Sequence, residues 1–169
     1  EDCLAWSSRR PVDLMLDSFD VSPRWCAIHA THMTAAETER LAKSGAVAGL
    51  CPTTEANLGD GIFPAVSYLK AGGAIAIGSD SHITVSLAED LRMLEYSQRL
   101  RDRTRNALAA GPGLSTGRTL FDAVCRGGAQ SMAREKRSQP RHALAGTAQR
   151  IHVHLQRQVR HRGSVSGRA

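Results

Sequence analysis

The sequence predicts an α/β fold in which short parallel strands alternate with helices. Three short apolar runs, 25–29, 47–51 and 74–78, predict buried strands. Each run is followed by a segment whose apolar residues recur at helical spacing, the arrangement typical of repeated βα units. Because a helix separates each strand from the next, we expect the three strands to lie parallel in one sheet.

Helices are predicted on both sides of the first strand. Pro11 suits the first turn of a helix that Ser22-Pro23 ends. Thr34 and Glu37 have the spacing of a capping box, in which the Thr34 hydroxyl accepts from the Glu37 amide. A glycine after the last apolar position stops the helix, which is therefore expected over 34–44.

The later part of the chain alternates loops with helices. The segment 52–61 is polar and contains glycine, which predicts a loop, and apolar spacing predicts a helix over 62–72. Ser86 and Glu89 form a second capping box, which opens a helix that runs into a charged stretch. A last helix is predicted over 120–132.

The composition excludes several classes of protein. With 169 residues the chain is long enough for a core, but it is shorter than the roughly 250 residues of a complete (β/α)₈ barrel. No apolar run approaches the roughly 18 residues that span a bilayer, so we expect neither a membrane segment nor a membrane partner. The four cysteines lie far apart with no C-x-x-C pair, which favours reduced thiols and a cytoplasmic location.

The net charge divides the chain at about residue 133. Residues 134–169 hold nine Lys and Arg and one acid, a net of +8, which leaves −2 of the total of +6 for residues 1–133. The segment 134–169 has no apolar periodicity, which predicts a basic tail that is disordered or frame-shifted. A nucleic-acid-binding protein that uses this tail is the alternative from another class, but no aromatic residues interleave with the basic ones. Nucleic acid is therefore not expected as a partner.

Polar side chains follow all three predicted strands. His29 ends the first, Thr54, Glu55 and Asn57 follow the second, and Asp80 and His82 follow the third. Because the carboxyl ends of parallel strands meet at one edge of a sheet, we expect these side chains to lie close together. A carboxylate and an imidazole there could bind a metal and move protons. A single His or Asp at a strand end more often caps a helix or bonds a loop, so both interpretations stay open on spacing alone.

Longer motifs around these residues resemble one enzyme family. The segments HATH at 29–32, CPTTEANLGDGIFP at 51–64 and IGSDSH at 77–82 are similar to the amidohydrolase superfamily, and within it to formimidoylglutamate deiminases. The segments 1–6 and 94–103 resemble the same family. The resemblance covers the chain ahead of the basic tail.

The resemblance implies a partial (β/α)₈ TIM-type barrel, from about its fifth or sixth unit to its eighth, in an enzyme with one zinc ion per site. It implies that Asp80 binds the metal and moves protons, and that His29 orients the attacking water. It also implies that the substrate contacts Thr54, Asn57 and His82. The implied reaction, from histidine degradation, hydrolyses the small molecule N-formimino-L-glutamate to N-formyl-L-glutamate and ammonia. The implied assembly of the complete enzyme is a homodimer.

Several residues that such an enzyme needs cannot be placed in this chain. The family's zinc site takes a His-x-His pair after the first strand and a His with a nearby Glu after the fifth, and neither precedes His29. The one His-x-His spacing, at 152–154, falls in the tail. One carboxylate and one imidazole cannot close a tetrahedral site, so we expect the isolated chain to be inactive. Because about three βα units leave a sheet edge open and the core exposed on one side, we also expect it to be poorly folded. A deaminase of the same superfamily that acts on a heterocycle is the alternative enzyme.

Overall fold

A computed structural model describes residues 2–81 and 84–132 of the chain. Within these residues one parallel sheet has the order β1-β2-β3, with the strands β1 (Cys26–Ile28), β2 (Val47–Leu50) and β3 (Ala74–Ile77). Ala48 of β2 lies opposite Ala27 of β1 and Ile75 of β3. The predicted α/β fold with parallel strands is confirmed, although each strand is slightly shorter than its apolar run.

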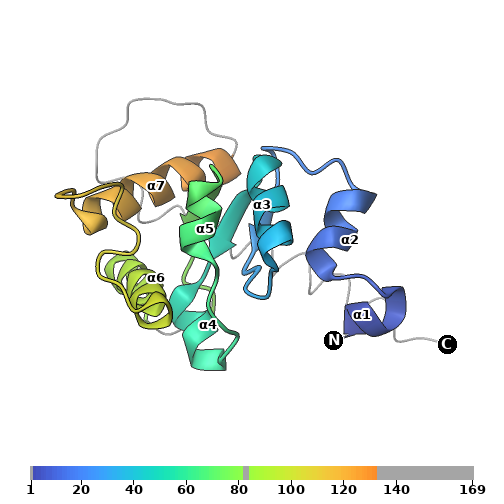
Figure 1. The fold of residues 1–169 in the computed structure, drawn as a ribbon, viewed down its shortest axis with the longest axis horizontal. Helices are drawn as coiled ribbons and strands as arrows, with labels where there is room; N and C mark the ends of the chain where they lie inside the picture. The colour runs from blue at the N-terminus through green and yellow to red at the C-terminus, as the bar shows by residue number, and fades with distance from the viewer. Residues whose placement is uncertain (1, 82–83, 133–169) are drawn as a thin grey trace.

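Helices connect and cover these strands (Figure 1). In the described residues they are α1 (Asp2–Ser7), α2 (Pro11–Ser18), α3 (Ala35–Lys43), α4 (Pro52–Leu58), α5 (Ala65–Lys70), α6 (Leu87–Asp102) and α7 (Thr116–Ser131). The helix α3 lies beside α5, α4 contacts α6, and α7 packs against β3. The succession of strands and helices is therefore that of consecutive βα units.

Hydroxyl caps begin three of the helices. The predicted capping box is confirmed in both directions, because the Thr34 hydroxyl accepts from the Glu37 amide and the Glu37 carboxylate accepts from the Thr34 amide. The Ser86 hydroxyl accepts from the Glu89 amide at the start of α6. The hydroxyl of Ser115 caps α7 in the same way. These caps satisfy amides that have no partner within their own helix.

The predicted loop over 52–61 is wrong, because Pro52–Leu58 form the helix α4. Proline suits the first turn of a helix, where no amide hydrogen is needed. The amide and the hydroxyl of Thr53 both donate to the Asp90 carboxylate of α6, at 3.1 and 2.8 Å. Gly59 ends the helix in the left-handed conformation, with φ 72°. A contact 37 residues away along the chain therefore stabilises a helix that local composition does not predict.

Two further helix boundaries differ from the predictions, and one helix was not predicted. The helix α5 begins after Pro64 and not at 62, because Phe63 is buried in the core, where its ring lies 5.2 Å from that of Tyr68. The helix α7 begins at Thr116 and not at 120, because the Ser115 cap extends it. The short helix α1 was not predicted at all, and it has no buried residue that would produce a pattern.

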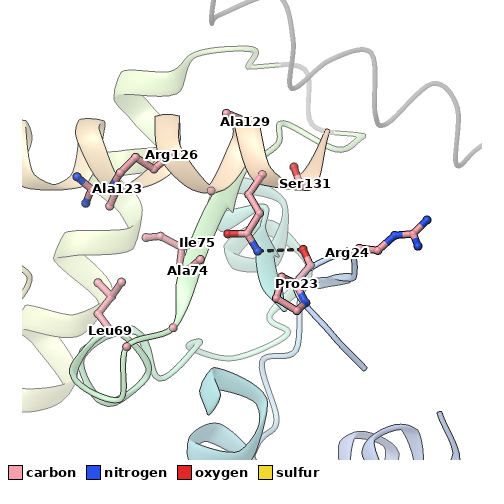
Figure 2. Close-up of a pocket in the computed structure, with 13 residues that line it drawn as sticks. Pro23, Arg24, Leu69, Ala74, Ile75, Ala123, Arg126, Ala129 and Ser131 are labelled. Atoms are coloured by element: carbon pink, nitrogen blue, oxygen red, sulfur yellow. Dashed lines mark hydrogen bonds between the residues drawn. The ribbon is translucent and has the colours of Figure 1, made fainter. Parts of the chain in front are cut away.

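The amino ends of the strands are held by close packing and by hydrogen bonds from side chains to the backbone. The Tyr68 hydroxyl donates to the carbonyl oxygen of Ala46, directly before β2, at 2.9 Å. Gly127 of α7 lies so close to β3 that an added Cβ would be 2.0 Å from the carbonyl oxygen of Ile75. Beside this contact is a cavity of about 780 Å³ lined by α7, by the start of β3 and by the segment before β1 (Figure 2). The Gln130 amide closes one side of it by donating to the carbonyl oxygens of Pro23 and Gly45, at 3.0 and 2.8 Å.

Some predictions lie outside the described residues. The basic tail over 134–169 and the side chain of His82 are among them. For residues 2–81 and 84–132, no helix combines the length and the apolar character that crossing a membrane requires.

Candidate active site at the carboxyl ends of the strands

His29 and Asp80 meet at the carboxyl end of the sheet although their strands are not neighbours. His29 follows β1, Asp80 lies three residues after β3, and β2 runs between them. The His29 Nε2 atom is 3.8 Å from an Asp80 carboxylate oxygen. That distance is too long for a direct hydrogen bond, but it allows both atoms to bond to the same water molecule. The structure therefore brings together the two residues to which the resemblance assigns the chemistry.

The backbone at both strand ends adopts the left-handed conformation. His29, Ala30 and Asp80 have φ values of 67°, 50° and 50°. Residues other than glycine rarely adopt such values, and they persist where the surrounding structure holds them in place. The amide of His29 donates to the carbonyl oxygen of Gly49 at 2.8 Å, which fixes the backbone at this position. The backbone conformation thus fixes the positions of the His29 and Asp80 side chains just beyond the ends of their strands.

Glu55 is a third member of this group, a polar residue after the second predicted strand to which the sequence assigned no role of its own. It lies in the first turn of α4, where its Oε1 atom accepts from the Cys51 amide at 2.8 Å. The same atom is 3.2 Å from Nδ1 of His29. The Glu55 side chain is 5% exposed, against 38% for His29 and 20% for Asp80. The carboxylate therefore lies behind the imidazole, on the side away from Asp80.

Burial and charge control the ionisation of the groups around His29. Burial raises the pKa of Glu55, and hydrogen bonds from the Cys51 amide and from His29 oppose this effect in part. The pKa of the neighbouring Cys51 thiol is raised by burial and then by the negative charges of Glu55, Asp80 and Asp90. Because only a thiolate is a strong nucleophile or metal ligand, Cys51 acts as a neutral, packed side chain.

The three other predicted site residues differ in position. The Thr54 hydroxyl donates to the carbonyl oxygen of Ser79 at 3.0 Å, which ties α4 to the loop that carries Asp80. Asn57 is exposed on α4, two residues beyond Glu55. His82 lies outside the described residues. A role of these three residues in substrate binding stays a prediction.

The donor groups of this end of the sheet fit part of a zinc site. Imidazole nitrogen, carboxylate oxygen and sulfur are the donors that zinc prefers, and donor atoms of His29, Cys51 and Glu55 lie within 4.8 Å of one another. Of these groups, the neutral thiol of Cys51 is a poor ligand, and Glu55 is already bonded to Cys51 and His29. Asp80 is the carboxylate that would hold a metal on the open side of His29. The described residues do not close a tetrahedral shell around it.

Comparison with known proteins gives close relatives of the chain, although no family model matches it. It is 56% identical over 132 residues to formimidoylglutamate deiminase from Pseudomonas aeruginosa. That match covers 78% of this chain and 29% of the relative. An 8-oxoguanine deaminase from the same organism is 32% identical over 115 residues, which are 64% of this chain and 26% of that enzyme.

Solved structures agree with the sequence relatives. An amidohydrolase from Brucella melitensis superposes with a TM-score of 0.77 at 58% identity, over 79% of this chain and 30% of that one. An adenosine deaminase from Xanthomonas campestris with bound zinc gives a TM-score of 0.68 at 26% identity, over 78% of this chain and 29% of that one. The chain thus spans about three tenths of the length of the relatives that it matches. By sequence and fold it belongs to the amidohydrolase superfamily, as part of a barrel similar to that of formimidoylglutamate deiminase.

Proposed function

We propose that this chain forms the part of a formimidoylglutamate deiminase that carries its proton-transfer carboxylate and its water-orienting histidine. The observation that carries the proposal is the approach of His29 and Asp80 to 3.8 Å across the end of β2. The 56% identity to the Pseudomonas aeruginosa enzyme supports the choice of reaction. The substrate is then N-formimino-L-glutamate, and the products are N-formyl-L-glutamate and ammonia.

The two side chains divide the chemistry between them. With a hydrogen on Nδ1, the Nε2 atom of His29 accepts a hydrogen bond from the attacking water and orients its oxygen toward the formimino carbon. Asp80 takes a proton from that water as the new C–O bond forms, and it gives the proton to the nitrogen that leaves. Both hydrogens of the water end on ammonia when the C–N bond breaks. The separation of 3.8 Å allows both acceptors to face one water molecule.

A divalent metal completes the proposal, with zinc as the ion and Asp80 as its ligand from this chain. When bound, such an ion lowers the pKa of its water to about 7, which makes hydrolysis possible near neutral pH. The relative from Xanthomonas campestris binds zinc, which supports the choice of metal. The remaining ligands have to come from outside residues 2–81 and 84–132.

A hybrid enzyme tests the proposed function. Residues 1–132 of this chain replace the matching segment of the Pseudomonas aeruginosa formimidoylglutamate deiminase, so that a whole barrel contains His29 and Asp80 of this chain. We expect the hybrid to release ammonia from N-formimino-L-glutamate, to lose activity with a chelator and to regain it with zinc. A folded, zinc-loaded hybrid without turnover would refute the proposal.

A second candidate is a deaminase that acts on a heterocycle. The 32% identity to 8-oxoguanine deaminase favours it as the runner-up. The same hybrid separates the two candidates when it is assayed with 8-oxoguanine beside N-formimino-L-glutamate. Preference for the purine would favour the second candidate.

A further inference from the structure

The imidazole of His29 faces two acids from two different elements. Its Nδ1 atom is 3.2 Å from Oε1 of Glu55 in α4, and its Nε2 atom is 3.8 Å from the carboxylate of Asp80 after β3. Only the first distance is that of a hydrogen bond. The two ring nitrogens are therefore in different environments, one bonded to a buried carboxylate and one directed at the open side of the site.

We propose that Glu55 is a positioning residue that keeps the hydrogen of the neutral His29 ring on Nδ1 and so keeps Nε2 as an acceptor. This inference rests on the proposed function for its catalytic consequence, because it assigns Glu55 the task of preparing His29 to orient the attacking water. This role requires no contact of Glu55 with the substrate or with the reacting atoms.

The hydrogen-bond pattern around Glu55 determines the direction of its bond to the ring. Its Oε1 atom already accepts from the Cys51 amide at 2.8 Å, so this oxygen acts as an acceptor. An acceptor at 3.2 Å from Nδ1 requires the hydrogen to be on Nδ1. In a neutral imidazole the other nitrogen then has a lone pair, because the hydrogen bond of one ring nitrogen decides the state of the other.

Two side-chain hydrogen bonds hold α4 and make Glu55 a rigid support. The hydroxyl of Thr53 donates to Asp90 of α6 at 2.8 Å, and that of Thr54 donates to the Ser79 carbonyl oxygen at 3.0 Å. Both Thr54 and Glu55 are buried. A catalytic side chain gains precision when the group that orients it is itself fixed by packing and hydrogen bonds. The helix therefore holds Glu55 in a fixed position behind His29, a residue whose backbone is in the left-handed region.

Nitrogen NMR of the full 169-residue chain tests the inference directly. In the wild-type chain, at a pH where the ring is neutral, we expect the His29 resonances of an Nδ1–H tautomer. The variant Glu55→Gln keeps an acceptor at the same place and should retain this tautomer. The variant Glu55→Met keeps the length of the side chain without the acceptor and should shift the ring toward Nε2–H. An Nε2–H ring in the wild-type chain, or an unchanged ring in Glu55→Met, would overturn the inference.

A matched control separates this effect from general loss of structure. Tyr68→Phe removes one buried hydrogen bond at the opposite end of β2 and touches no residue of the site. We expect it to leave the His29 tautomer as in the wild-type chain. Circular dichroism of each variant shows whether the fold is kept. A shift of the tautomer in Tyr68→Phe as large as that in Glu55→Met would assign Glu55 a merely structural role.

Kinetics of the hybrid enzyme distinguish failure of this inference from failure of the proposed function. We expect Glu55→Met to lower kcat by about 10- to 100-fold with little change in KM, as for other residues that orient active-site histidines, and Glu55→Gln to restore most of the rate. An active hybrid whose rate ignores both substitutions would refute the role of Glu55 alone. A hybrid without turnover whose His29 tautomer still follows Glu55 would refute the proposed reaction and leave the positioning role supported.

Discussion

The two ends of the sheet are built from different kinds of residue. At the carboxyl end, an imidazole, a thiol and two carboxylates lie together, and three residues other than glycine adopt left-handed φ values. At the amino end, the contacts are those of close packing: Gly127 against Ile75, and side-chain donors to backbone carbonyl oxygens. A cavity of about 780 Å³ lies at this second end.

This difference shows that the presence of a cavity alone does not identify the site. The cavity of about 780 Å³ is lined mainly by glycine, small and apolar residues, with Arg24 and Arg126 as its charged members. It contains no pair of groups suited to proton transfer. In parallel α/β sheets the catalytic residues lie beyond the carboxyl ends of the strands, whereas the residues at the amino ends serve stability. We therefore expect substitutions at the two ends to affect different measurements.

The largest expected effect is the loss of activity in Asp80→Asn. The amide keeps the shape of the carboxylate but cannot take a proton from water, and general acid–base catalysis contributes about 10²- to 10⁴-fold to a rate. We expect kcat of the hybrid enzyme to fall about 10³-fold while the midpoint of urea unfolding stays unchanged. Asp102→Asn, at an exposed end of α6, is the matched control and should leave kcat unchanged. A large shift of the unfolding midpoint in Asp80→Asn would show that the carboxylate serves the fold.

The largest expected loss of stability is at the amino end, in Gly127→Ala. The new Cβ would lie 2.0 Å from the Ile75 carbonyl oxygen, so α7 has to move away from β3. We expect the free energy of unfolding of the full chain to fall by about 3 kcal/mol, measured by urea denaturation. In Gly128→Ala nothing lies within 4 Å of the new Cβ, and alanine should stabilise the helix by about 0.5–1 kcal/mol. Equal effects of the two substitutions would contradict the close contact.

The sequence predicted the sheet better than it predicted the site. The apolar runs and the Thr34 capping box are local patterns, and the structure confirms them. The helix α4 escaped prediction because its stabilising bond to Asp90 joins residues far apart in the chain. The contact of Glu55 with His29 escaped prediction for the same reason: Glu55 lies in the segment predicted as a loop, and His29 is 26 residues away. The parallel strands predicted that His29 and Asp80 lie at one edge of the sheet, but their separation of 3.8 Å depends on the position of β2 between their strands, which spacing along the chain does not give.

A smaller loss of stability is expected in Tyr68→Phe. The substitution leaves the Ala46 carbonyl oxygen without its donor in a buried position at the start of β2. The cost should be about 1–2 kcal/mol in the free energy of unfolding. The activity of the hybrid enzyme should not change, because β2 is held at its other end by the contacts of Cys51 and Glu55. A fall of kcat without loss of stability would show that the two ends of the sheet are coupled.

The last expected effect is a difference between two cysteines that emerges only at alkaline pH. Burial raises the pKa of the Cys26 thiol in β1 from 9.0 to about 11. The unfolded chain then loses this proton at lower pH than the folded chain, so the stability that the neutral thiol provides is full below pH 9 and is lost as the pH rises through 11. For one such group the slope is at most about 1.4 kcal/mol per pH unit. Cys26→Ala should therefore flatten the fall of the free energy of unfolding between pH 9 and 11.

Cys51 makes this comparison specific to the two ends of the sheet. Its thiol lies at the carboxyl end, where burial and then the charges of Glu55, Asp80 and Asp90 raise its pKa further than that of Cys26. The stability linked to Cys51 should therefore be lost over a pH range that begins at the same value and extends higher. Urea denaturation of Cys26→Ala and Cys51→Ala across alkaline pH measures the two ranges. Identical profiles would mean that the negative charges of Glu55, Asp80 and Asp90 do not raise the pKa of Cys51.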